Sequence, residues 1–101
     1  MQSFYPESFE RDMATTGAEW QSRWPLAMGS VPWAVVGDST VHAHLPEGGQ
    51  LTMQWTPLPD RVIALMRVPR LRVFFHFDQA NQDARYRFMR HFDLVMQRGG
   101  G

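Results

Sequence analysis

The chain has 101 residues, of which 44% are hydrophobic, and this length is close to the commonest size of a single domain with one core. It contains no cysteine, which excludes a disulfide framework, a thiolate zinc site and a cysteine nucleophile. No basic segment followed by an apolar one begins the chain, and no window approaches roughly 18 uninterrupted apolar residues. We therefore expect one soluble, cytoplasmic domain over residues 1–101, with frayed ends at 1–4 and 99–101.

The formal net charge is zero, but the charges are unevenly divided. Residues 1–60 carry two arginines against seven acidic residues, whereas residues 61–101 carry eight arginines against three aspartates. Such a division can give a basic face for an anionic partner, or an acidic N-terminal helix lying near a basic C-terminal one. The near-neutral isoelectric point favours the second interpretation, because nucleic-acid-binding domains are usually strongly basic.

The first predicted element is a helix that begins near Pro6, because proline is tolerated in the first turn. Hydrophobic side chains recur at four-residue spacing at Tyr5, Phe9 and Met13, which is typical of one face of an amphipathic helix.

The same spacing continues at Trp20 and Trp24. Thr16 and Glu19 match a capping box, so two short helices are the alternative to one bent helix. We expect Pro25 to end this helical region, because the residue before a proline is biased away from helical geometry.

Strands are predicted next. Residues 33–36 and 39–45 favour a hairpin around a two-residue turn at 37–38, because glycine reaches positive φ without steric strain. A second turn at 46–49 leads into a strand over 50–56.

Two prolines, Pro57 and Pro59, are expected to end that strand, because proline cannot donate to a central ladder. Residues 62–68 are almost entirely apolar and indicate either a buried strand or a helical turn, of which we prefer the strand. Pro69 then separates this segment from a strand over 70–77.

The last element is an amphipathic helix over residues 84–97. The connections between strands are too short for crossover helices, which excludes parallel wiring. The predicted fold is therefore α+β: an N-terminal helix or two short helices, an antiparallel meander of four to five strands, and a C-terminal amphipathic helix packed on one sheet face.

Alternation along the strands sorts the side chains between the two sheet faces. The face under the helices is expected to carry Val41, Ala43, Leu45, Leu51, Met53, Trp55, Leu71, Val73, Phe75 and Phe77. The opposite face is expected to carry Thr40, His42, His44, Thr52, Gln54, Arg72, Phe74 and His76. The core stripe of the last helix is predicted at Ala84, Phe88, Met89, Phe92, Val95 and Met96.

Three histidines, His42, His44 and His76, are candidate ligands for zinc or another divalent metal, because two of them alternate on one strand and the third can share their face. The alternative is a plain solvated sheet face. Asp78 could form an acid–base pair with His76, but the position better suits a strand end or a helix cap. The sequence carries no nucleophile elbow and no phosphate-binding glycine loop, so no catalytic residue and no nucleotide cofactor are predicted.

Two candidate binding surfaces remain. Arg72, Phe74 and His76 would lie together on the outer sheet face, where aromatic and basic side chains can also stack on single-stranded nucleic acid. Strand 70–77 lacks the glycines of the RNP1 motif, so nucleic acid is the less favoured partner.

The second surface is the far side of the last helix, with Tyr86, Arg90 and Leu94, residue types that include those enriched at protein interfaces. The terminal residues 97–101 resemble the diglycine ends of ubiquitin-like and sulfur-carrier proteins. The alternative, which we favour, is a glycine helix stop.

From the sequence we expect a small, non-enzymatic protein of bacterial type that binds a protein partner or forms a homodimer. A single-stranded nucleic-acid binder is the alternative, and a histidine-ligated metal protein or enzyme is a further one.

Overall fold

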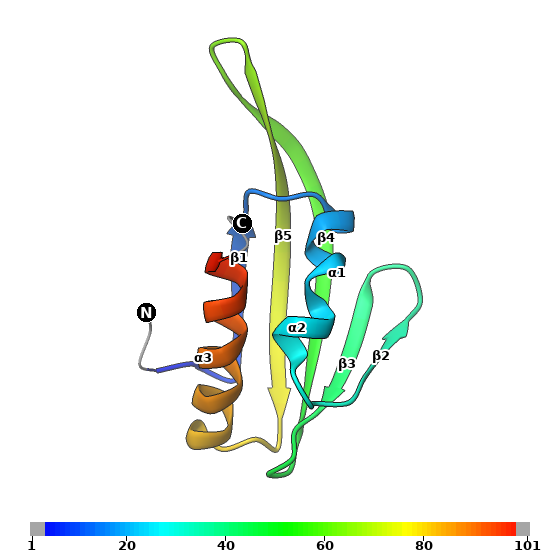
Figure 1. Cartoon of the computed structure of the whole chain (residues 1–101), viewed down its shortest axis with the longest axis vertical. Coiled ribbons are helices and arrows are strands. Elements are labelled where there is room, and N and C mark those ends of the chain that lie inside the picture. The colour runs from blue at the N-terminus through cyan, green and yellow to red at the C-terminus, as the bar shows by residue number, and fades with distance from the viewer. Residues whose placement is uncertain (1–3, 99–101) are drawn as a thin grey trace.

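The computed structural model describes residues 4–98 and contains a five-stranded antiparallel sheet with three helices. The strands stand in the order β1-β5-β4-β3-β2 (Figure 1). Their bounds are β1 Ser8–Met13, β2 Trp33–Val36, β3 Thr40–His44, β4 Gln50–Ile63 and β5 Met66–Asp78. The helices are α1 Gly17–Ser22, α2 Trp24–Met28 and α3 Gln82–Arg98.

All three helices lie on the same face of the sheet (Figure 1). Strands β2 to β5 form the predicted meander, and the α+β class with a C-terminal helix on one sheet face is confirmed. The fraying expected at 1–4 and 99–101 falls outside the described residues except for Phe4. No helix within residues 4–98 is long and apolar enough to cross a lipid bilayer.

The helix predicted from Pro6 is wrong, because residues 8–13 form β1. This strand pairs with β5, so it extends the sheet at the edge opposite β2. Phe9 and Met13 pack partly buried against the core, and exposed side chains alternate with them. The four-residue spacing was ambiguous, because four is also a multiple of the two-residue strand period.

The two short helices do form, and Thr16 caps the first one by accepting a hydrogen bond from the Glu19 N–H at 3.1 Å. Pro25 does not end the helical region. It lies in the first turn of α2, where the missing N–H would have no helical partner. Trp20 and Trp24 bring these helices onto the sheet through edge contacts with each other and with Trp55.

The predicted sheet core is confirmed, because all ten residues assigned to it are buried. On α3, the core stripe is also correct: five of its six residues are buried and Val95 is partly buried. Arg85 and Asp93 are buried on the same helix, which the sequence analysis did not predict. The α3 cap is Asn81, whose Oδ1 accepts from the Ala84 N–H at 2.9 Å, while Asp78 ends β5.

The β2–β3 turn has three residues, because Val36 pairs with Thr40, so the two-residue turn predicted there is wrong. The strand end predicted at Pro57 and Pro59 is also wrong, because β4 continues to Ile63. Strand β3 pairs with β4 only as far as Gln54. Beyond that point β4 has a single neighbour, so a proline there interrupts no second ladder.

The segment predicted as one apolar strand over 62–68 is instead the end of a hairpin. Ile63 pairs with Met66 across a turn at Ala64 and Leu65, and β5 runs on through Pro69. We call residues 58–70 the arm, which projects from the sheet at one end of the molecule (Figure 1). The arm is largely exposed, not buried, because no helix reaches it.

Candidate functional site

The outer face of the sheet, which no described helix covers, carries every residue that the sequence analysis assigned to it. We call it the open face. All eight of these side chains are exposed or partly exposed, and β1 adds Ser8, Glu10 and Asp12. The open face is therefore largely polar where β1, β5, β4 and β3 lie side by side.

The three candidate metal ligands lie on the open face but are spread across it. The strand pairing places Thr52 between His42 and His76, and neighbouring strands are about 4.8 Å apart. His44 lies further along β3, opposite Gln50. No group of three histidine or carboxylate side chains within residues 4–98 could hold a metal ion.

Two of these histidines have hydrogen-bond partners on the neighbouring strand. The Nδ1 atom of His76 lies 2.6 Å from the hydroxyl of Ser8, and that of His42 lies 2.9 Å from the hydroxyl of Thr52. These contacts orient the rings along the sheet surface. The open face therefore presents fixed polar groups and no ligand cluster.

Arg72, Phe74 and His76 follow one another on the open face of β5, as predicted. Phe74 is partly exposed between Glu10 on β1 and Gln54 on β4. The charge of Arg72 is offset, because its Nε lies 3.5 Å from Asp12 and 4.0 Å from Glu10.

Arg70 likewise reaches Asp12 at 3.3 Å. The acids of β1 thus neutralise much of the positive charge beside Phe74, which weakens the case for phosphate binding.

The second predicted surface, Tyr86, Arg90 and Leu94, lies on α3 and therefore on the other side of the sheet from Phe74. Arg90 and Leu94 are exposed, but Tyr86 is half-buried, and its ring centre lies 6.5 Å from that of Tyr5. The two predicted sets cannot form one continuous surface, because the sheet separates them.

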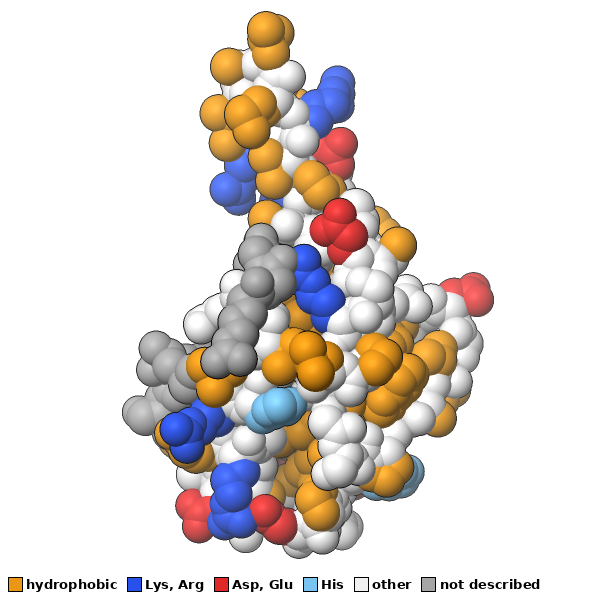
Figure 2. All heavy atoms as spheres, viewed as in Figure 1, with side chains coloured by type: hydrophobic (Ala, Val, Ile, Leu, Met, Phe, Trp, Pro, Cys, Tyr) orange, Lys and Arg blue, Asp and Glu red, His pale blue; other side chains and the backbone are white. Residues whose placement is uncertain are grey.

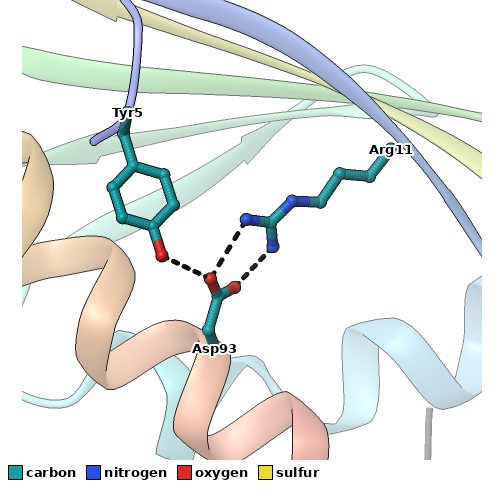
Figure 3. Close-up of polar contacts among 3 residues, drawn as sticks. All are labelled: Tyr5, Arg11 and Asp93. Atoms are coloured by element: carbon teal, nitrogen blue, oxygen red, sulfur yellow. Dashed lines mark hydrogen bonds and ion pairs between the residues drawn. The ribbon is translucent and has the colours of Figure 1, made fainter. Parts of the chain in front are cut away.

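A buried polar cluster that the sequence did not predict joins Tyr5, Arg11 and Asp93 (Figure 3). The Tyr5 hydroxyl donates to Asp93 Oδ2 at 2.7 Å, and Arg11 Nη2 donates to the same oxygen at 3.0 Å. Arg11 Nη1 donates to Oδ1, which completes a two-pronged ion pair. The partners are 82 and 88 residues apart in sequence, so no local motif could have revealed them.

Burial and the neighbouring carboxylate of Asp93 raise the pKa of Tyr5 to about 12. Burial lowers the pKa of Arg11, but the hydrogen bonds and charge of Asp93 outweigh it and raise the pKa overall. Tyr5 and Arg11 are therefore held protonated at neutral pH, so neither is suited to act as a base. The cluster ties the N-terminal segment and β1 to α3.

One small cavity, of about 270 Å³, lies between α2, the β3–β4 turn and α3. Its apolar wall includes Met28, Leu45 and Phe88, and its polar wall includes Arg87, Glu47 and His91. The polar groups are engaged: Arg87 Nη1 donates to Glu47 Oε1 at 2.6 Å, and His91 Nε2 lies 3.0 Å from the carbonyl oxygen of Leu26. The volume is just below the range of ordinary ligand sites.

The arm ends in exposed hydrophobic side chains, seen as orange spheres at the far end of the molecule in Figure 2. Val62, Ile63 and Met66 are each more than half exposed, and Leu65 is fully exposed. The sequence pattern did not reveal this surface, because the apolar residues at 62–68 favour a buried strand. The turn at Ala64 and Leu65 places this segment at the exposed end of a hairpin and not in a buried strand.

The chain matches no protein-family model, and a search of curated proteins finds no relative. The surfaces of the molecule are therefore the basis for its functional assignment.

Proposed function

We propose that this protein is a non-enzymatic interaction module that binds a protein partner through the open face. The observation that supports it is the uncovered row of β5, in which Phe74 lies partly exposed between Arg72 and His76 and opposite Gln54 of β4. An aromatic residue beside arginine, ringed by polar groups, is a typical centre of a protein interface. As part of the same proposal, we assign the protein to the cytoplasm.

Single-stranded nucleic acid is the second candidate for the same face, because Arg72, Phe74 and His76 could stack on bases. The ion pairs of Arg72 with the acids of β1 make it the weaker candidate. Titration of a labelled oligonucleotide at low and high salt separates the two. Salt-sensitive binding that is lost in Phe74→Ala would replace the protein-partner proposal.

The direct test uses a photo-crosslinking amino acid at Gln54, which is exposed beside Phe74. We expect illumination of cells to give a discrete protein adduct. The same probe at Arg90, on the opposite side of the molecule, is the control and should not give that adduct.

Phe74→Asp in the Gln54 probe protein should abolish the adduct, because the charge would be buried in the contact. An adduct that forms equally from Arg90, or that persists with Phe74→Asp, would contradict a role for the open face.

A further inference from the structure

Most of the exposed large hydrophobic side chains lie in two groups, and neither group includes Phe74 of the open face. Of the ten large ones that are exposed within residues 4–98, four are at the arm tip and three are on β2. The tip patch consists of Val62, Ile63, Leu65 and Met66, and the β2 patch consists of Trp33, Val35 and Val36. Orange areas are visible in Figure 2 at the end of the arm and near β2.

The tip patch is apolar on both sides of the hairpin. Ile63 pairs with Met66, and Val62 lies one residue earlier on β4, so its side chain points to the other side. Leu65 in the turn is 101% exposed. A flat surface would cover only one side of such a hairpin. The tip therefore suits a surface that contacts both of its sides.

Two arginines flank the tip patch directly, Arg61 before it and Arg67 after it. Arg61 pairs with Val68 and Arg67 pairs with Val62, which places one arginine on each side of the arm. Both side chains are exposed, and no carboxylate within the described residues pairs with either of them. Asp60 is the one nearby acid in the arm, so this part of the molecule is net positive.

The β2 patch lies at an open sheet edge and reaches both faces of it: Trp33 and Val35 are on the helix side, and Val36 is on the open face opposite Thr40. Strand β2 pairs with β3 alone, so its outer edge leaves backbone groups free for a further strand or side chains. Asp38, in the adjacent turn, is exposed and forms no ion pair with any described basic residue. This patch is therefore apolar with a negative group beside it.

We infer that the occupant of both patches is a second copy of this chain. The arm tip of one copy would pack on the β2 patch of the other, with Arg61 and Arg67 facing Asp38. The apolar groups match and the unpaired charges are opposite, which favours this contact over a random one. The net charge of zero adds no repulsion between copies.

A twofold dimer is the simplest assembly that satisfies the contact. Each copy would give its tip and receive its partner's tip, so both patches of both copies are covered. The contact uses neither Phe74 nor Arg72, so it is independent of the proposed function and leaves that part of the open face accessible.

Sedimentation velocity of the full chain over a concentration series tests the dimer. We expect a monomer–dimer equilibrium that Leu65→Asp and Val35→Asp each weaken by roughly tenfold or more. Leu94→Asp, an exposed leucine on α3, is the matched control and should leave the dissociation constant unchanged. A chain that stays monomeric, or a dimer lost only in Leu94→Asp, would overturn the inference.

Mixing the two variants tests which patch meets which. Leu65→Asp and Val35→Asp chains together can form a heterodimer with one undamaged tip-to-β2 contact, so it should form more readily than either homodimer. Equal weakness of all three would reject the proposed pairing. A Val35→Asp homodimer of wild-type strength would also reject it, because that result indicates a tip-to-tip contact.

Charge reversal gives a third readout that a loss of folding cannot imitate. Asp38→Arg alone, and Arg61→Asp with Arg67→Asp, should each weaken the dimer, whereas the combined variant should restore it. A combined variant weaker than either parent would contradict the predicted facing of these charges. None of these outcomes bears on crosslinking at Gln54, so the two proposals can fail separately.

Discussion

Asp93 is a buried carboxylate whose oxygens receive hydrogen bonds from two residues far away in the chain. A buried charge is tolerated only when it is paired and hydrogen-bonded, and Tyr5 with Arg11 meets both conditions. The Arg11 guanidinium also lies 5.3 Å from the ring centre of Phe9 and 5.6 Å from that of Phe75. Lysine could not reproduce both the two-pronged contact and the packing over the rings.

The Tyr5 hydroxyl should make stability depend on alkaline pH. Its pKa is about 12 in the folded protein and about 10 in the unfolded chain, so this contribution is complete below pH 10 and is lost as the pH rises toward 12. Over this window the wild type should lose about 2 kcal/mol through Tyr5. Urea denaturation at several pH values measures the slope.

Tyr5→Phe should be less stable at neutral pH, by about 1 kcal/mol for the lost hydrogen bond. Its stability should fall less than that of the wild type above pH 10, because the group that titrates is gone. An equal alkaline decline in both proteins would show that Tyr5 is not held protonated by folding.

At the scale of elements, the turn between β3 and β4 fixes how the sheet meets α3. Gly49 has a φ of +83°, and a Cβ placed there would lie 2.6 Å from the carbonyl oxygen of Gln79. The backbone of the turn therefore contacts the backbone of the β5–α3 connection directly. Only glycine combines this conformation with so close an approach.

Gly49→Ala should lower the free energy of unfolding by about 2 kcal/mol or more, because backbone strain and a clash with backbone add together. Gly37→Ala is the matched control: its φ is +71°, but nothing lies within 4 Å of the added Cβ. Its loss should be clearly smaller. Equal losses in chemical denaturation would show that the contact with Gln79 is unimportant.

The prolines in β4 and β5 show how element ends depend on neighbours. Pro57 sits in a continuous strand because β3 ends its pairing with β4 at Gln54. A register shift between Leu58 and Arg61 absorbs the irregularity that follows. Pro57 is therefore tolerated in β4, where β5 is the one neighbouring strand.

For the whole molecule, the arm is separable from the core. Residues 59–67 are all exposed. Every buried residue of β4 and β5 lies outside this range. The arm therefore adds little to folding and is available for contact with another molecule.

Replacing residues 59–69 with Asn-Gly, to join Leu58 to Arg70 by a tight hairpin, should change the free energy of unfolding by less than about 1 kcal/mol. Denaturation is measured in dilute solution, where association does not contribute. The truncated chain should also sediment as a monomer. A loss of several kcal/mol would show that the arm supports the core.

Much of the fold could be predicted from local patterns. Alternation assigned both faces of β3, β4 and β5, and the 3.6-residue period assigned the inner stripe of α3, because these periods follow from backbone geometry. The open-face residues were identified in the same way. The cluster of Tyr5, Arg11 and Asp93 could not be predicted, because it depends on where β1 and α3 come together.

The sequence by itself determined which side chains are buried in the central strands and in α3, since burial follows hydrophobic periodicity. Only the tertiary structure decided that residues 8–13 are a strand, because a four-residue spacing fits both periods and pairing with β5 selects one. It also decided that the apolar segment 62–68 is exposed. A hydrophobic run is buried only if another element covers it, and no described helix extends over the arm.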